Sequence, residues 1–377
     1  MGGFLMIELI GKYNKAKIMI DNVDGDTISQ VYNILNNPAV EGAHISIMPD
    51  CHVGNGVVVG FTMKINKFIV PAVIGVDIGC GIEAYKLGRL KKLKLDKFDD
   101  FIRKNIPSGV GIRKKATVEL AGIYDVCKKL NLRYNEIICG IGSLGGGNHF
   151  IELDKDEENN IWLVIHTGSR RFGYEVAKYH QYKAKELMKD IYIGSAYNGL
   201  EYLTYDNGGK EYIDDMQLAQ RYAELNRTVI ARDIIEGFFK LRYEDVEVIK
   251  SVHNYINLED RIIRKGAISA HKGEKVIIPF NMSFGCLIGV GKGNETYNYS
   301  APHGAGRVMS RSAAKDKISL EIFQKSMKGI FSTTVCDKTI DEAPMAYKKP
   351  KVILENIKDT VEEGFLIKPV YNFKAVS

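Results

Sequence analysis

Five residues with side chains suited to metal binding recur at the ends of strand-like stretches. Asp77 and Cys80 lie in VDIGCG, His149 follows the glycines of GGGNH, His166 ends NIWLVIH, and His253 lies in SVHNY. One carboxylate, one thiolate and three imidazoles suit zinc, manganese or iron, and a thiolate can bridge two ions. Five ligands exceed what one structural zinc needs, so the set predicts either two metals or one metal with an open position.

A second group of reactive residues surrounds His303 in SAPHGAGRVMSR. The small residues at 304–306 would let backbone N–H groups approach a phosphate, and we expect a helix to begin there, with an N-terminus that favours negative charge. Arg307 and Arg311 could clamp phosphate oxygens. His303 could then attack a phosphorus atom and form a phosphoramidate. The same residues would equally suit an ordinary capped helix entrance.

Other candidate motifs lack the context that their chemistry needs. GIGSLG (140–145) fits the dinucleotide fingerprint, but the following GGNHFIELD is typical of a loop and a strand, not a helix. GVGKG (289–293) ends in glycine where a P-loop requires Ser or Thr, although it could still face a phosphate. His44, His180 and His271 have no glycine-rich surroundings, and we expect ordinary structural roles for them, with His180 half-buried in a helix.

The elements that position these residues alternate irregularly along the chain. FIVPAVIGV (68–76) and NIWLVIH (160–166) are predicted to be buried strands, because they are rich in Val and Ile and lack helical periodicity. Apolar residues recur at helical spacing over 174–190, 214–242 and about 305–328. Strands, then helices, then strands again predict an α+β fold with mixed β-sheets and peripheral helices.

Length and composition indicate a globular protein. The chain has 377 residues, of which 45% are hydrophobic, and no convincing linker or internal repeat. We therefore expect a single large domain over 1–377, with a helical elaboration at about 170–245. No apolar run approaches the length of a membrane span, and the N-terminal stretch lacks the features of a signal peptide, so we expect the cytoplasm. Six scattered cysteines indicate reduced thiols, and a net charge of +6 is compatible with a polyanionic partner.

Several motifs together resemble the RtcB family of GTP- and manganese-dependent RNA ligases, in its shorter bacterial branch. They cover nearly the whole chain in family order: MPDCHVGNG (48–56), GVDIGCG (75–81), GSLGGGNHFIE (142–152), IHTGSRR (165–171), HN (253–254), HGAGRVMSR (303–311), DEAPMAYK (341–348) and Lys374. The resemblance implies an RtcB-like fold. It also implies that an RNA 3′-phosphate or 2′,3′-cyclic phosphate is joined to a 5′-hydroxyl, in RNA repair or tRNA splicing.

The resemblance also implies a role for individual residues. Two manganese ions would be bound, one by Asp77, Cys80 and His149 and the other by Cys80, His166 and His253. GTP would guanylylate His303, and GMP would then pass to the RNA 3′-phosphate. Arg170 would contact an RNA phosphate, and Asp50 and His52 would support the site. The remaining residues would contact the nucleotide: Asn148, Glu152, Gly304, Ala305, Gly306, Arg307, Tyr347 and Lys374.

The sequence departs from the family pattern at three places. FNMSFGCL (280–287) replaces the usual GSMGTxSY, Pro302 precedes His303 where many members have Cys, and Lys374 is followed by Ala375 instead of Gly. A metal-dependent phosphodiesterase acting on cyclic phosphate ends, or an RNA-binding module with structural metal, could use the same five ligands. Neither alternative needs a nucleotide-linked histidine, which is the feature that separates them from a ligase.

Overall fold

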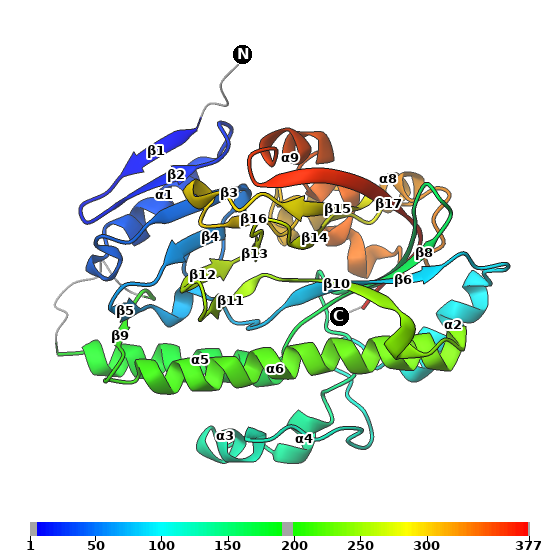
Figure 1. Cartoon of the computed structure of the whole chain (residues 1–377), viewed down its shortest axis with the longest axis horizontal. Coiled ribbons are helices and arrows are strands. Elements are labelled where there is room, and N and C mark those ends of the chain that lie inside the picture. Colours follow the sequence, from blue (N-terminus) through cyan, green and yellow to red (C-terminus); the bar gives the residue numbers. More distant parts are fainter. Residues whose placement is uncertain (1–5, 191–198, 376–377) are drawn as a thin grey trace.

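The computed structural model describes residues 6–190 and 199–375, and it confirms a mixed α+β fold. Figure 1 shows two large sheets in the upper part of the molecule and two long helices, α5 and α6, lying side by side beneath them. Within the described residues, no helix is long and apolar enough to cross a membrane. The predicted helical segment at 170–245 contains residues 191–198, which lie outside the described residues.

The first sheet has six strands and carries the Asp50 end of the site. Only β2 and β3 pair in parallel, and the other neighbours are antiparallel. Its strands, in spatial order, are β1 (Ile7–Ile10), β2 (Lys15–Ile18), β3 (Ile45–His52), β4 (Val59–Lys64), β12 (Ile262–Lys265) and β11 (Asn254–Asn257).

The second sheet has seven antiparallel strands and curls until its edge strands meet. Their spatial order is β10 (Glu247–Val252), β6 (Gly81–Gly88), β8 (Ile161–Thr167), β7 (Phe150–Lys155), β17 (Val361–Lys374), β15 (Gly285–Gly291) and β14 (Lys275–Asn281). Ile277 of β14 donates its backbone N–H to Ser251 Oγ of β10 at 3.0 Å. The curled sheet encloses apolar side chains such as Trp162, Val164 and Ile288, which form a core of their own.

Helices cover the sheets from outside, and two short strand pairs complete the fold. The pairs are β13 (Ala267–Ser269) with β16 (Ser300–Pro302), and β5 (Phe68–Ile69) with β9 (Leu203–Thr204). The α-helices are α1 (Gly25–Leu35), α2 (Leu95–Asn105), α3 (Ile123–Lys129), α4 (Tyr134–Ile138), α5 (Arg170–Met188), α6 (Gly209–Ile234), α7 (Arg311–Lys317), α8 (Leu320–Ser326) and α9 (Pro350–Asn356).

The predicted strand at 68–76 was wrong beyond its first two residues. Only Phe68–Ile69 pairs as β5, and a short 3₁₀ turn follows at Pro71–Val73. Pro71 has no N–H for a sheet ladder and its fixed φ suits the start of a helical turn. The strand predicted at 160–166 is confirmed as β8, and the helices predicted at 174–190 and 214–242 are confirmed as α5 and α6 with shifted ends.

The single helix predicted at about 305–328 was also wrong. Residues 303–310 form an irregular loop, in which Gly306 adopts a positive φ of 71°. Helix α7 begins only at Arg311, where the side chain of Ser310 accepts from the N–H of Ala313, and Ser319 caps α8 in the same way. Serine favours the N-cap position, so each serine starts a new short helix. His303 is therefore not at a helix N-terminus.

A buried arginine joins α6 to the ends of β6 and β8. Arg227 Nε lies 3.0 Å from Glu83 Oε1, and both side chains are only 1% exposed. Arg227 Nη1 also donates to the carbonyl oxygens of Gly79 and Thr167, each at 2.9 Å. Gly79 is tightly packed here, because a Cβ on it would lie 2.8 Å from the Cα of Gln220 in α6. The arginine thus fixes two turns that lead into the metal-binding residues.

We expect Arg227→Met to lower the free energy of unfolding by about 3–5 kcal/mol, because Glu83 would stay buried without its partner. Urea denaturation followed by circular dichroism measures this. Lys250→Met is the matched control, since Lys250 pairs with Glu224 at 2.8 Å on the surface and should cost less than about 1 kcal/mol. An equal cost for the two changes would contradict the role assigned to Arg227.

Candidate functional site

The antiparallel register brings the ends of β6, β7, β8 and β10 together around His166. His166 of β8 is paired with Phe150 of β7 on one side and with Ile82 of β6 on the other. His149 directly precedes Phe150, and Cys80 lies two residues before Ile82. Residues far apart in the sequence therefore meet, because neighbouring strands of one sheet start or end next to one another.

Strand β10 and the turn before β6 supply the other two ligands. Val252 pairs with Gly81, and the next residue, His253, donates its backbone N–H to Cys80 O at 2.9 Å. Asp77 lies in the turn that leads to Cys80, whose N–H donates to Asp77 O at 3.2 Å. All five predicted metal ligands thus gather in one place.

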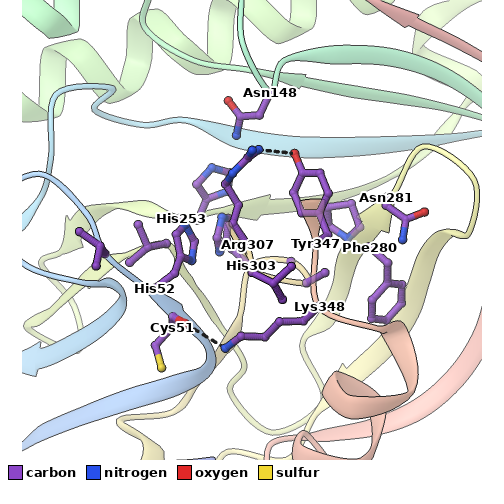
Figure 2. A pocket seen from close by; sticks show the side chains of 18 of the residues that line it. Cys51, His52, Asn148, His253, Phe280, Asn281, His303, Arg307, Tyr347 and Lys348 are labelled. Atoms are coloured by element: carbon purple, nitrogen blue, oxygen red, sulfur yellow. Dashed lines mark hydrogen bonds between the residues drawn. The ribbon is translucent and has the colours of Figure 1, made fainter. Parts of the chain in front are cut away.

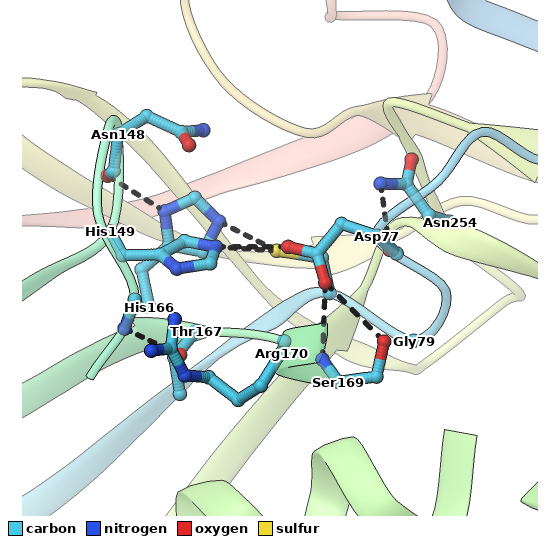
Figure 3. A network of polar contacts seen from close by, with 12 residues as sticks. Asp77, Gly79, Asn148, His149, His166, Thr167, Ser169, Arg170 and Asn254 are labelled. Carbon is cyan, nitrogen blue, oxygen red and sulfur yellow. Dashed lines mark hydrogen bonds and ion pairs between the residues drawn. The ribbon is translucent and has the colours of Figure 1, made fainter. Parts of the chain in front are cut away.

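The five side chains form a chain of contacts with the Cys80 thiol at its centre. Figure 3 shows three of them, Asp77, His149 and His166, facing one another. Cys80 Sγ lies 3.3 Å from His149 Nε2 and 3.3 Å from His166 Nε2. At one end, His149 Nε2 is 3.0 Å from Asp77 Oδ2, and at the other, His166 Nε2 is 3.3 Å from His253 Nε2. Cys80 therefore belongs to both halves of the cluster, which is the geometry that a bridging ligand needs.

Burial sets the protonation of these groups. It lowers the pKa values of His166 and His253 well below their usual value, so both imidazoles are neutral and can bind a metal. It raises the pKa of the Cys80 thiol well above its usual value, and the nearby Asp77 carboxylate acts in the same direction. Burial alone would raise the pKa of Asp77, but the hydrogen bond and charge of His149 bring it down to about 2. A divalent cation is the species that would convert the thiol to a thiolate here.

Surrounding polar groups orient the ligands. His166 Nδ1 lies 3.2 Å from the carbonyl oxygen of Asn148, which fits an N–H donor at Nδ1 and leaves the Nε2 lone pair facing the thiol. Asp77 Oδ1 accepts from the backbone N–H of Ser169 at 3.1 Å. Gly168 must be glycine because a Cβ there would lie 2.2 Å from Asp77 Oδ1. The donor set and its orientation fit a pair of transition-metal ions.

Two other groups of potential ligands occur in the described residues. Glu152, Asp154 and Cys286 are fully buried together, and burial raises the pKa of Glu152 to about 7 and that of Asp154 well above its usual value. Protons can therefore neutralise this acidic pair. His180 lies 2.7 Å from Asp215, which also pairs with Lys129 at 2.5 Å, so lysine charge already balances the second group. His180 is fully buried and not half-buried as predicted.

His303 faces a cavity of about 1190 Å³ next to the metal-binding cluster (Figure 2). Its Nδ1 lies 2.7 Å from Asp50 Oδ2, and its ring centroid is 4.7 Å from that of His253. Asp50 is fully buried, so an Nδ1–H donated to its carboxylate would leave Nε2 as the nitrogen with a free lone pair. The pKa of His52 in the same cavity is lowered by burial to about 4.

Close backbone packing explains the glycine-rich stretch after His303. A Cβ on Gly306 would lie 2.1 Å from Asp50 O, so only glycine lets this loop approach β3. Lys348 fixes the same contact from the other side, because its Nζ donates to Pro49 O and Cys51 O, both at 2.9 Å, and its N–H donates to Gly306 O. These glycines position His303 beside Asp50 and do not open a helix.

A buried carboxylate organises the far wall of the cavity. Glu342 accepts from Tyr347 OH at 2.6 Å and pairs with Lys374 at 3.0 Å and with Arg311 at 2.6 Å. Burial alone would raise its pKa, but Lys374 and Arg311 bring it down to about 2. The guanidinium of Arg307 stacks on the Tyr347 ring, 5.2 Å from its centroid. The wall thus combines an aromatic ring with several fixed charges.

The residues predicted to contact a nucleotide all line this cavity: Asn148, Glu152, Gly304, Ala305, Gly306, Arg307, Tyr347 and Lys374. Arg170 does not, and its guanidinium instead donates to Ser143 Oγ at 3.2 Å and to Gly109 O. The residues 289–293 do not line the cavity either. Sequence reasoning missed Glu342 and Lys348 and gave Asp50 no defined role, although all three lie in motifs that it had recognised.

Comparison with known proteins identifies the family of this chain. The family described as "tRNA-splicing ligase RtcB" matches residues 30–136 and 128–375. The chain is 30% identical to "RNA-splicing ligase RtcB" of Escherichia coli strain K12 over 387 residues, covering 92% of this chain and 94% of that protein. It is 26% identical to "tRNA-splicing ligase RtcB" of Methanococcus maripaludis, covering 92% and 90% of the two chains.

These matches span both the five predicted metal ligands and the cavity that holds His303. A family match over most of the chain, together with 30% identity across nearly the full length of a relative, leaves no doubt about descent. The chain belongs to the RtcB family.

Proposed function

We propose that this protein is a cytoplasmic RNA ligase that joins an RNA 3′-phosphate or 2′,3′-cyclic phosphate to a 5′-hydroxyl, using GTP and two Mn²⁺ ions. The names of its relatives support an RNA ligase acting in RNA repair or tRNA splicing. The observation that carries the proposal is the position of His303, which is bonded to Asp50 and adjacent to His253 at the edge of a large cavity.

One manganese would be bound by Asp77, Cys80 and His149, and the other by Cys80, His166 and His253. The contacts of 3.3 Å from Cys80 Sγ to two imidazole nitrogens support a shared thiolate. When bound, the ions would neutralise phosphate charge and orient the attacking group. Manganese accepts carboxylate and imidazole ligands, whereas a thiolate among them argues against magnesium.

His303 would be the nucleophile of the first step. With Nδ1–H held by Asp50, Nε2 attacks the α-phosphorus of GTP, an N–P bond forms, and the bond to pyrophosphate breaks. An oxygen of the RNA 3′-phosphate then attacks the same phosphorus, which restores His303 and leaves GMP on the RNA. The 5′-hydroxyl oxygen finally attacks the 3′-phosphate, GMP leaves, and the hydroxyl proton is lost. A 2′,3′-cyclic phosphate must first be hydrolysed to a 3′-phosphate.

The far wall of the cavity suits the nucleoside part of GTP. The Tyr347 ring offers a stacking surface, and Lys374 and Arg307 are held near it by the ionised Glu342. Asn148 and Glu152 also line the cavity, and the Nζ of Lys374 donates to Asn148 O at 3.3 Å. The phosphodiesterase alternative is less favoured, because the relatives of this chain are named as ligases and hydrolysis needs no nucleotide-linked histidine.

The first test concerns the shared thiolate. Cys80→Ala should abolish Mn²⁺-dependent ligation and lower the bound metal count by at least one ion per chain, because both halves of the cluster contact its sulfur. Plasma mass spectrometry and a ligation assay measure the two effects. Manganese affinity of the unaltered protein should rise with pH, since binding must displace the thiol proton, and should rise less steeply in the variant.

Cys127→Ala is the matched control, because Cys127 is also a buried thiol but lies in α3 away from the cluster. It should retain full activity and metal content. Full ligation by Cys80→Ala in Mn²⁺ would rule out the bridging assignment.

A second test concerns the RNA ends. A phosphate on the 5′ end of the acceptor RNA should block joining completely, because the 5′-hydroxyl oxygen is the nucleophile of the last step. Gel analysis of a 3′-phosphate donor with 5′-hydroxyl or 5′-phosphate acceptors measures this. Preferential joining of 5′-phosphate to 3′-hydroxyl ends would identify a different class of ligase.

A third test separates His303 from the metal-binding residues. His303→Ala should still bind Mn²⁺ and GTP but should gain no covalent GMP, as measured by intact mass after incubation with both. The variant should still seal an RNA that already carries GMP on its 3′-phosphate. His52→Ala is the control within the same cavity and should be labelled normally. Labelling of His303→Ala, with loss of labelling in His52→Ala, would move the nucleophile to His52.

A further inference from the structure

The segment 106–122, between α2 and α3, contains neither helix nor strand. An irregular connection of this length is uncommon in a compact fold and usually has a function. The segment carries three basic residues, Arg113, Lys114 and Lys115, and one acidic residue, Glu119. Arg113 pairs with Asp233, so Lys114 and Lys115 supply the exposed positive charge of the segment.

The tip of this segment exposes apolar side chains beside its lysines. Val110 is fully exposed, Ile112 is 42% exposed, and Lys114 and Lys115 are both exposed. Such residues contribute nothing to a core. Apolar contacts next to cations are what proteins use to bind a nucleic acid strand, since bases and riboses need a packing surface and phosphates need positive charge.

Hydrogen bonds nevertheless attach the exposed tip to the stretch 139–144. The N–H of Leu144 donates to Pro107 O at 2.7 Å, and the N–H of Arg113 donates to Cys139 O at 2.9 Å. Arg113 Nε also donates to Gly142 O at 3.0 Å. The segment is thus bound to the stretch 139–144, which continues directly to His149. A tip held in this way loses little conformational entropy when it binds a ligand.

Arg170 links the segment to the metal-binding cluster. Its guanidinium donates to Gly109 O, next to Val110, and to Ser143 Oγ at 3.2 Å. A Cβ on Gly145 would lie within 2.6 Å of Arg170 Nη1 and within 2.0 Å of His149 Nδ1, so the arginine and this predicted metal ligand flank the same glycine. Val110 therefore follows directly after Gly109, the residue that is bonded to Arg170, and Arg170 lies beside the same glycine as His149.

We propose that the segment 106–122 binds the single-stranded RNA next to the end that reacts. Val110 and Ile112 would pack against a base or ribose, and Lys114 and Lys115 would pair with two backbone phosphates. This inference rests on the proposed ligase function, to which it adds a path for the RNA strand. Because the contacts are with the backbone and with any base face, binding is independent of sequence.

The first test is Lys114→Ala/Lys115→Ala, measured by fluorescence anisotropy with a single-stranded RNA bearing a 3′-phosphate. Removing two phosphate contacts should lower the slope of log affinity against log salt by about 1.4, which corresponds to about 25-fold weaker binding at 0.1 M salt. Val110→Asp should also weaken binding severalfold, whereas Val110→Leu, which keeps an apolar tip, should bind normally.

The matched control is Lys185→Ala/Lys189→Ala, which removes the same charge from the far end of α5. About 22 Å separate Lys185 from the start of this helix, so RNA binding should change little. Unchanged affinity and salt slope in the Lys114/Lys115 variant, or an equal loss in the control, would overturn the proposal.

Covalent labelling by GTP separates this inference from the proposed function. The Lys114/Lys115 variant should be guanylylated as fast as the unaltered protein, because these side chains do not line the cavity of His303. If the unaltered protein bound RNA through the segment but was never guanylylated, the ligase mechanism would fail and the RNA path would stand. If guanylylation were lost together with RNA binding in the variant, the segment would be a structural support and the proposal would be wrong.

Discussion

The buried pair of Arg227 and Glu83 is the constraint on which the site depends. Its charges are removed from water, so each needs the other, and Nη1 of the arginine donates to the carbonyl oxygens of Gly79 and Thr167. Those two carbonyls belong to the turn before Cys80 and to the residue after His166. One side chain of α6 therefore fixes the direction of both backbone segments, and the helix acts as a brace for the chemistry on the sheet above it (Figure 1).

The fixed backbone holds together a cluster of buried polar side chains whose burial would otherwise be unfavourable. Three imidazoles, a thiol and a carboxylate are buried together, and burial keeps two of the imidazoles neutral and the thiol protonated. In water these side chains would separate and be solvated, but the register of β10, β6, β8 and β7 leaves them no alternative. The site is preorganised by backbone hydrogen bonds, and a cation gains the ligands without having to assemble them.

The five candidate metal ligands could be picked out from the sequence because they recur at the ends of strand-like stretches, and the structure brings all five together. The α+β fold followed from the irregular order of strands and helices. The sequence-based prediction failed where a local signal for ending an element opposed the apolar pattern around it. Pro71 ended a strand that its apolar neighbours suggested, and Ser310 and Ser319 divided a periodic helical stretch in two. Asp50 and Glu342 act through partners more than 30 residues away, and no spacing rule can reveal such a contact in a single sequence.

The stretch that departs most from the family pattern contributes to the cavity wall, away from His303 in the chain. Phe280, Asn281 and Met282, from the stretch that departs most from the family pattern, line the cavity together with Tyr347 (Figure 2). The ring of His303, by contrast, is tilted by 53° against that of His253, and its Nδ1 bonds to Asp50. His303 is thus held by Asp50 of β3, while Phe280 and Asn281 end β14 and Met282 begins the turn to β15. Under the proposed mechanism, changes at these three residues would alter the shape of the cavity and leave His303 in place.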